Sequence, residues 1–168
     1  MLDGIHKIHL IGIGGSGMRA IANILIQKGY DVSGSDIAES AVISKFRDMG
    51  ATVHIGHNKE YVNGVDAIVR STAIREDNPE IVAAKEQGIT ILHRSDIVKA
   101  VLDVTDGIAV AGAHGKTSTT SMIGQILVEA NADPTVIIGG EVDYLKGSSC
   151  LGKGHFSVVE ADESDGSF

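Results

Sequence analysis

Short runs of apolar residues alternate with amphipathic stretches through the N-terminal part of the chain. Apolar runs bounded by glycine or polar residues are typical of buried strands, whereas a helical apolar period is typical of surface helices. The pattern predicts strands at residues 7–13, 30–35, 51–55, 66–71 and 89–92, and helices at 18–28, 41–49 and 79–87. Because strands and helices alternate, we expect an α/β fold with a five-stranded, mostly parallel, Rossmann-like sheet over residues 1–103.

The alternation restarts in the C-terminal part of the chain. Residues 96–102 are expected to form a short helix or turn, and residues 103–107 resemble a hinge. The pattern then predicts a strand from Ile108, a helix through residues 122–130, and strands at 135–138 and 156–160 with a loop or hairpin between them. We therefore expect a second α/β domain over residues 104–168.

Composition narrows the possible partners and the compartment. A net charge of −8 and a pI near 5.2 argue against nucleic acid or an anionic membrane as the partner, because phosphate backbones require stripes of Lys and Arg. The single cysteine, Cys150, excludes an intramolecular disulfide. The sequence has neither a long apolar run nor a cleavable signal pattern, so we expect a cytoplasmic protein that does not bind membranes. The oligomeric state is left open.

A glycine-rich turn follows the first predicted strand. Gly12, Gly14 and Gly17 form the pattern G-x-G-x-x-G between a strand and a helix, and Asp36 ends the second strand about 20 residues downstream. In that context the pattern indicates a loop that binds a diphosphate, with the carboxylate near a ribose or a neighbouring hydroxyl. A tight turn without a ligand is the alternative.

Polar residues also follow the fourth and fifth predicted strands. Ligands of open α/β sheets bind outside the carboxyl ends of the strands, so Ser71, Thr72 and Arg94 are candidate ligand contacts. An arginine there suits a phosphate or a carboxylate. Ser71 and Thr72 fit equally well as helix caps, and Arg94 fits equally well as a surface residue paired with Glu86 or Asp96.

A second phosphate loop is predicted where the pattern restarts. An apolar run from Ile108 leads into G-A-H-G-K-T-S, where glycines and a helix N-terminus favour an anion and Lys116 can reach terminal phosphates. Thr117 is a candidate Mg²⁺ ligand. Because Val110 stands where the usual P-loop has its first glycine, the motif is a shorter variant. Helix capping without a ligand is the alternative.

An acidic segment ends the last predicted strand. Glu160, Asp162, Glu163 and Asp165 crowd together after an apolar run. Carboxylates placed so closely repel one another, and a divalent cation relieves that repulsion. We expect Glu160 to bind Mg²⁺ opposite the phosphates, with a solvated acidic loop as the alternative. His6, His9, His54, His57 and His155 show no metal-ligand spacing, so we interpret them as strand or loop residues.

Several segments together carry a family resemblance. They are HLIGIGGSGM (9–18), SGSD (33–36), STAI (71–74), HRSD (93–96), AGAHGKTSTT (111–120) and VVEADESDGSF (158–168). In this order they resemble the Mur ligases, the ATP-dependent ligases of peptidoglycan synthesis and cell-wall biogenesis. Within the family they are most similar to the members that attach L-alanine to UDP-N-acetylmuramate.

The resemblance implies a role for each candidate residue. The UDP part of the substrate is expected at Gly14, Gly15, Ser16, Gly17, Met18, Asp36, Ser71, Thr72 and Arg94. ATP is expected at Gly112, Ala113, His114, Gly115, Lys116, Thr117 and Ser118. Lys116 and Glu160 are expected to be catalytic, and Thr117 and Glu160 to hold Mg²⁺. Ala113 replaces a threonine that is usual in the family, which leaves the backbone donors unaffected.

The resemblance also implies a mechanism. The carboxylate of UDP-N-acetylmuramate attacks the γ-phosphate of ATP, and the amine of L-alanine attacks the resulting acyl phosphate. Members of the family have three domains, whereas this chain reaches only the first part of the second, the P-loop ATPase domain. We therefore expect the chain by itself to be unable to ligate.

Alternative functions stay open at this point. A related ligase that recycles murein peptides uses the same UDP sugar, and the amino-acid site that separates the two lies outside this chain. An NAD-binding dehydrogenase or a nucleotide-sensing module would explain the first glycine loop and Asp36, but not Lys116 or Glu160. A structural or interaction role would leave both loops without a ligand.

Overall fold

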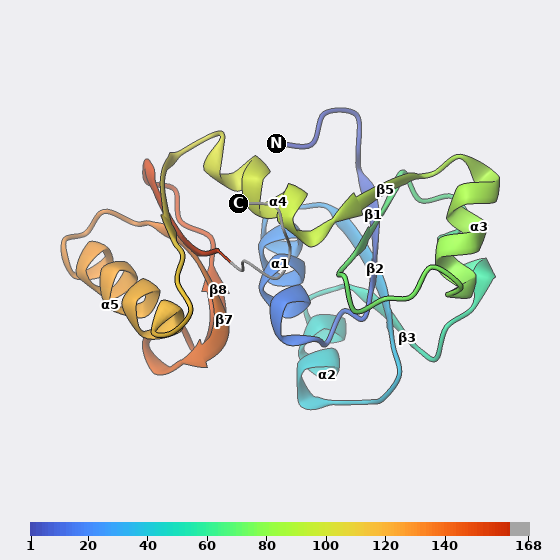
Figure 1. Ribbon diagram of the computed structural model, residues 1–168, viewed down its shortest axis with the longest axis horizontal. Coiled ribbons are helices and arrows are strands. Elements are labelled where there is room, and N and C mark those ends of the chain that lie inside the picture. The colour runs from blue at the N-terminus through green and yellow to red at the C-terminus, as the bar shows by residue number, and fades with distance from the viewer. Residues whose placement is uncertain (162–168) are drawn as a thin grey trace. The chain divides into compact units, whose positions relative to one another are not determined.

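Residues 1–161 are described by the computed structural model of the protein (Figure 1). Contacts within the chain divide it into a first unit, Leu2–Arg94, and a second unit that begins at Ser95. The sequence pattern placed the boundary between two functions after residue 103, and that functional boundary stays a prediction.

The first unit is built on a parallel sheet of five strands in the order β3-β2-β1-β4-β5. All four strand pairs are parallel, as the alternating pattern predicted, so the Rossmann-like fold is confirmed. The chain leaves β1 on one side towards β2 and later returns on the other side to β4, which makes the end of β1 the switch point where such sheets bind ligands. The strands are β1 (Lys7–Ile11), β2 (Asp31–Asp36), β3 (Thr52–Ile55), β4 (Ala67–Arg70) and β5 (Thr90–His93).

Helices cover both faces of this sheet. In Figure 1, α1 and α2 lie on one face and α3 lies on the other. A 3-10 helix, η1, packs against α3; the sequence pattern did not predict it. The helix α3 has the ends that its sequence predicts, with Asn78 as N-cap and Gly88 as C-cap at φ +67°. The bounds are α1 (Ser16–Gln27), α2 (Ala41–Asp48), η1 (Lys59–Val62) and α3 (Pro79–Gln87).

Aliphatic side chains fill the core of the first unit. Along β1, Ile8 and Leu10 point to one face of the sheet, and His9 and Ile11 point to the other, because side chains alternate along a strand. All four side chains are buried. Ile11 packs in one cluster with Val62, Ile68, Ile81 and Ala84, which places this cluster between the sheet and α3. His9 is therefore a polar side chain within an apolar layer.

The second unit has a mixed sheet in the order β6-β9-β7-β8. The first two pairs are parallel and β7 with β8 is antiparallel, so the segment expected as a loop or hairpin is a hairpin. The expected hinge is shorter than predicted, because Asp106 and Gly107 pair with the start of β9. The elements are α4 (Arg94–Leu102), β6 (Asp106–Val110), α5 (Lys116–Glu129), β7 (Thr135–Val142), η2 (Asp143–Leu145), β8 (Gly147–Cys150) and β9 (Phe156–Glu160).

A truncation at Ile68 tests the core between the sheet and α3. Ile68 is fully buried, so Ile68→Ala leaves a cavity and is expected to lower the free energy of unfolding of the first unit by about 2–5 kcal/mol. Val82→Ala on α3 is the control, because Val82 is 40% exposed and its truncation is expected to change stability by less than about 0.5 kcal/mol. Urea unfolding followed by NMR signals of the first unit measures both. Equal losses would contradict the packing described.

Candidate functional site

The glycine loop between β1 and α1 is held by the end of β2. Gly12 turns the chain at φ +73°, and the amides of Gly12 and Ile13 both donate to the carbonyl oxygen of Ser35, at 2.8 and 3.1 Å. The amide of Gly15 donates to the carbonyl of Gly12 at 3.0 Å. In the described part of the chain no side chain caps α1, so the amides of its first turn remain available for an anion.

Asp36 lies directly beside this loop. Its Oδ2 accepts a hydrogen bond from the amide of Gly14 at 2.8 Å, and its Oδ1 accepts one from the amide of Ile37, also at 2.8 Å. The carboxylate therefore fixes the shape of the loop. Each carboxylate oxygen can accept a further hydrogen bond, so a contact between Asp36 and a ribose stays a prediction.

Arg94 reaches the same loop from the end of β5. A Cβ built on Gly17 would lie 1.9 Å from Arg94 Nη1, so the guanidinium rests against the first turn of α1. This contact requires a glycine at position 17. A cation placed there adds its charge to the partial positive charge of the helix N-terminus, an arrangement that suits an anion such as a diphosphate.

Ser71 and Thr72 lie in the turn after β4. The amide of Ile74 donates to the carbonyl of Ser71 at 3.1 Å, and a Cβ built on Gly12 would lie 3.3 Å from Ile74 Cδ1. The turn therefore packs against the glycine loop. The next helix, α3, takes Asn78 as its cap, so Ser71 and Thr72 do not cap it. The loop, Asp36, Arg94 and this turn meet at the carboxyl ends of the strands.

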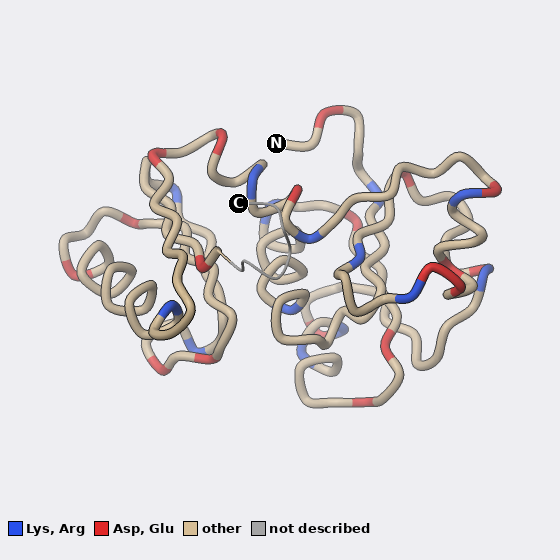
Figure 2. The backbone as a smooth tube through the Cα atoms, in the orientation of Figure 1, with Lys and Arg blue, Asp and Glu red and all other residues tan. Residues whose placement is uncertain are grey.

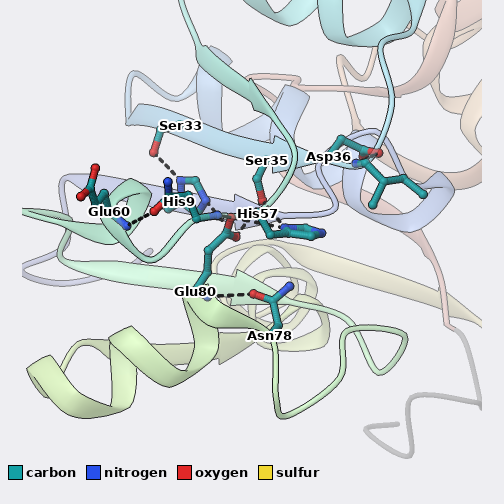
Figure 3. A network of polar contacts seen from close by, with 10 residues as sticks. His9, Ser33, Ser35, Asp36, His57, Glu60, Asn78 and Glu80 are labelled. Carbon is teal, nitrogen blue, oxygen red and sulfur yellow. Dashed lines mark hydrogen bonds and ion pairs between the residues drawn. The ribbon is translucent and has the colours of Figure 1, made fainter.

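A buried network of polar side chains lies on the α3 face of the same sheet (Figure 3). At its centre is Glu80, which is 0% exposed. Glu80 Oε2 accepts a hydrogen bond from Ser35 Oγ at 2.7 Å and lies 3.4 Å from His9 Nε2. Glu80 Oε1 accepts one from the amide of Asn58 at 3.2 Å and lies 3.3 Å from His57 Nδ1.

Sequence reasoning missed this network. His9 and His57 were interpreted as ordinary strand and loop residues, and Glu80 was not singled out. The sequence did contain one signal. Two strands that are expected to be buried each carry a polar residue, His9 in β1 and Ser35 in β2. Buried polar side chains require partners, but the sequence does not say which distant residue supplies them.

The ionisation of Glu80 reflects these contacts. Burial by itself raises the pKa of the Glu80 carboxyl, but the contacts with His9 and Ser35 and the amide of Asn58 outweigh burial and hold the pKa below its ordinary value. The carboxylate is therefore the form that the folded first unit favours.

The second loop leads from β6 into α5. Gly112 has φ +145° and Gly115 has φ +78°, conformations that favour glycine, and Gly115 is the N-cap of α5. Lys116 Nζ donates to the carbonyl oxygen of Gly112 at 2.7 Å, so the ammonium bends back over its own loop. Ala113, His114 and Ser118 are exposed. This is the strand, loop and helix arrangement that the sequence predicted.

Thr117 and Glu160 meet beside this loop. Thr117 Oγ1 lies 3.0 and 3.1 Å from the two carboxylate oxygens of Glu160, to which it donates. They come together because β9 pairs with β6, with Glu160 opposite Val110. A hydroxyl and a carboxylate are the oxygen donors that Mg²⁺ prefers, so this pair fits the predicted metal ligands. Asp162, Glu163 and Asp165 lie outside the described residues.

Two glycines of β7 make room for this pair. A Cβ on Gly139 would lie 3.0 Å from Glu160 Oε2, and a Cβ on Gly140 would lie 3.3 Å from Thr117 Cγ2. The amide of Gly139 also donates to Glu160 Oε2 at 2.7 Å. These glycines were expected only as the start of a polar segment. Their role depends on β7 lying beside β9.

The described residues also show how charged side chains, candidate metal ligands and apolar helices are distributed. Lys and Arg are interspersed with Asp and Glu in both units (Figure 2). No group of three or more His, Cys, Asp or Glu that could hold a metal ion occurs within residues 1–161. None of the helices there has the length and apolar character to cross a membrane. Burial raises the pKa of the Cys150 thiol, which disfavours a reactive thiolate.

Comparison with known sequences identifies relatives over the whole chain. The family described as "Mur ligase family, catalytic domain" matches residues 7–104. A protein of Solidesulfovibrio magneticus named UDP-N-acetylmuramate–L-alanine ligase is 48% identical over 168 residues, which are 100% of this chain and 37% of that protein. A protein of the same name from Sulfurihydrogenibium sp. is 48% identical over 98% of this chain and 36% of its own length. The chain thus spans little more than a third of these relatives.

Solved structures show the same fold. A UDP-N-acetylmuramate-alanine ligase from Thermotoga maritima superimposes with a TM-score of 0.87 at 36% identity, over 94% of this chain and 37% of that one. A UDP-N-acetylmuramate:L-alanyl-gamma-D-glutamyl-meso-diaminopimelate ligase from Neisseria meningitides also gives 0.87, at 28% identity, over 95% of this chain and 53% of that one. The fold expected from the sequence is thereby confirmed in solved relatives.

The pH dependence of stability tests the buried carboxylate. Because the pKa of Glu80 is lowered in the folded state, its contribution is present above the unfolded value of about 4.3 and is lost as the pH falls through the folded value. The stability advantage of the native chain over Glu80→Gln is therefore expected to shrink between about pH 5 and pH 3. His9 and His57, which face the carboxylate, are present in both proteins. Urea unfolding, followed at the buried amides of Leu10 and Val69, measures the difference in free energy of unfolding between the two proteins. A difference that does not change with pH would contradict a lowered pKa of Glu80.

Proposed function

Because the chain belongs to the Mur ligase family, we propose that it serves the ATP-dependent ligation of L-alanine to UDP-N-acetylmuramate in peptidoglycan synthesis. The observation that carries the proposal is the presence of two different phosphate loops in one chain. One is the glycine loop with Asp36 and Arg94, and the other is the Lys116 loop with the contact between Thr117 and Glu160. We also propose that the protein acts in the cytoplasm.

The first loop is proposed to bind the UDP part of the sugar nucleotide. Amides at the start of α1 would hold the diphosphate, and Arg94, which rests on Gly17, would neutralise its charge. Ser71 and Thr72 adjoin the loop as further contacts. This assigns substrate binding to residues 1–103 and leaves residues 104–168 to ATP.

The second loop is proposed to bind ATP together with Mg²⁺. Backbone amides of the loop and of the first turn of α5 would hold the phosphates, and Lys116 would stabilise the charge of the γ-phosphoryl group as it moves. Thr117 and Glu160 would hold Mg²⁺, which supplies charge neutralisation at the phosphates.

In the proposed reaction the substrate carboxylate attacks the γ-phosphorus of ATP and ADP leaves, which forms an acyl phosphate. The uncharged amine of L-alanine then attacks the acyl carbon, inorganic phosphate leaves with the bonding electrons, and the nitrogen gives up one proton to solvent. We propose that the described residues bind the phosphates in both steps. Because the chain spans 37% of a relative's length, we propose that it does not complete the ligation by itself.

A second candidate is the ligation of a recycled peptide to the same sugar nucleotide. A structure of that class, from Neisseria meningitides, matches with a TM-score of 0.87, but at 28% identity against the 48% of the L-alanine ligases. Both reactions use the same UDP sugar, so the first unit would serve either. The identities favour L-alanine.

Thermal unfolding with and without ligands tests the proposal. UDP-N-acetylmuramate at about a hundred times its Kd is expected to stabilise the first unit by about 2.7 kcal/mol, whereas NAD at the same concentration is expected to have no effect. Stabilisation by NAD alone would overturn the ligase proposal in favour of a dehydrogenase or a sensor.

Mg-ATP is expected to stabilise the second unit of the native chain and not that of Lys116→Ala.

Gly17→Ala tests the contact between Arg94 and the helix start. The added methyl group would displace the flexible end of Arg94 and narrow the approach to the helix amides, while alanine favours the helix. The fold is expected to survive, and UDP-N-acetylmuramate is expected to bind about tenfold more weakly, a loss of about 1.4 kcal/mol measured by titration calorimetry.

Two arginine variants control for the loss of charge. Arg94→Ala is expected to weaken binding as Gly17→Ala does, whereas Arg75→Ala is expected to leave it unchanged, because Arg75 is exposed and paired with Asp77. If Gly17→Ala and Arg94→Ala both bind UDP-N-acetylmuramate as tightly as the native chain does, this loop is not part of the binding site.

A further inference from the structure

Glu80 is a fully buried charge that the proposed reaction does not use. It lies in the first turn of α3, where Asn78 Oδ1 accepts a hydrogen bond from its amide at 2.9 Å. A buried carboxylate requires hydrogen bonds and charge partners, and an apolar side chain of similar volume is often as stabilising. A contribution to stability alone therefore does not explain why Glu80 is charged.

The contacts of Glu80 lead directly to the glycine loop. Ser35 Oγ donates to Glu80 Oε2 at 2.7 Å, and the carbonyl oxygen of the same Ser35 accepts the amides of Gly12 at 2.8 Å and Ile13 at 3.1 Å. Only one residue thus separates the carboxylate from the first two amides of the loop. Asp36, the next residue, holds the amide of Gly14 at 2.8 Å.

The other carboxylate oxygen ties the segment after β3 to the same point. Glu80 Oε1 accepts the amide of Asn58 at 3.2 Å, and His57 Nδ1 lies 3.3 Å from Oε1 and 3.2 Å from Ser35 Oγ. Figure 3 shows Glu80 reaching from α3 towards Ser35, His9 and His57. The carboxylate thus joins α3 to β2 and to the segment after β3.

His9 closes the network on the side of β1. Its Nδ1 lies 2.9 Å from Ser33 Oγ, and its Nε2 lies 3.4 Å from Glu80 Oε2. β1 leads directly into the glycine loop, and the end of β2 accepts hydrogen bonds from that loop. The network therefore contacts both strands that border the loop. Glu80 contacts both strands, β1 through His9 and β2 through Ser35.

We propose that Glu80 is a positioning residue: acting through Ser35, it fixes the amides of the glycine loop in the arrangement that receives a diphosphate. The identity of that ligand rests on the proposed function above. A loop that is already ordered loses little conformational freedom when a ligand binds, so a loosened loop lowers affinity without removing any ligand contact. Glu80 itself touches no part of the ligand.

The test compares two variants of Glu80 at the level of the loop. Glu80→Leu fills a similar volume without polar atoms, and Glu80→Gln keeps one acceptor oxygen. Hydrogen exchange of the Gly12 and Ile13 amides, followed by NMR, is expected to be about tenfold faster in Glu80→Leu and closer to native in Glu80→Gln. The Kd for UDP-N-acetylmuramate is expected to rise in the same order, by about tenfold for Glu80→Leu.

Ile81→Ala is the matched control for lost stability. Ile81 is the next residue of α3 and is fully buried, so its truncation destabilises the first unit without touching the network. In the folded Ile81→Ala protein, the amides of Gly12 and Ile13 are expected to exchange through local opening at the native rate. The affinity for UDP-N-acetylmuramate is expected to stay native as well. A merely structural Glu80 would give variants that behave like Ile81→Ala.

Ser35→Ala keeps the inference testable if Glu80→Leu does not fold. It removes the hydroxyl that joins Glu80 to the backbone of β2 and leaves the carboxylate in place, and it is expected to speed exchange at Gly12 and Ile13 as well. Native exchange in both Ser35→Ala and Glu80→Gln would overturn the inference. Failure of the native chain to bind UDP-N-acetylmuramate would instead overturn the proposed function, because the exchange measurement needs no ligand.

Discussion

The candidate site of the first unit depends on the hydrogen bonds between the end of β2 and the glycine loop. Ser35 and Asp36 accept three successive loop amides, those of Gly12, Ile13 and Gly14, through a carbonyl and a carboxylate. Backbone amides in a turn would otherwise have to find water or a ligand. These hydrogen bonds fix the loop just before α1. Among residues 1–161 no side chain caps α1, and Arg94 lies against Gly17 in its first turn.

The two proposed phosphate loops take their charged side chains from different parts of the chain. In the first, the carboxylate of Asp36 shapes the loop, and Arg94, at the start of α4, supplies the cation. In the second, Lys116 belongs to the loop itself, and the carboxylate of Glu160 accepts a hydrogen bond from Thr117, the pair proposed to hold Mg²⁺. The first arrangement suits the binding of the proposed sugar nucleotide, and the second suits the proposed transfer of a phosphoryl group.

Buried polar groups extend the role of the first sheet beyond a scaffold. The Glu80 network lies in the same layer as the aliphatic cluster around Ile68 and Ile81, and its members come from β1, β2, α3 and the segment after β3. Apolar contacts tolerate small shifts, whereas hydrogen bonds of a buried carboxylate are directional. A polar network next to a binding loop therefore defines the loop's position more narrowly than packing does.

Local sequence determined the elements and both loops, because periodicity, glycines and caps act between residues that are near one another in the chain. Helix α3 with Asn78 and Gly88, and the glycine positions of both loops, were all predictable in this way. Strand order and register are decided by distant segments, and local patterns do not specify them. The insertion of β9 between β6 and β7 puts Glu160 beside Thr117, 43 residues away, as the motifs had suggested. The packing of α3 on the first sheet joins Glu80 to Ser35, 45 residues away, and only the folded arrangement could show that contact, because neither residue carries a local signal that names its partner.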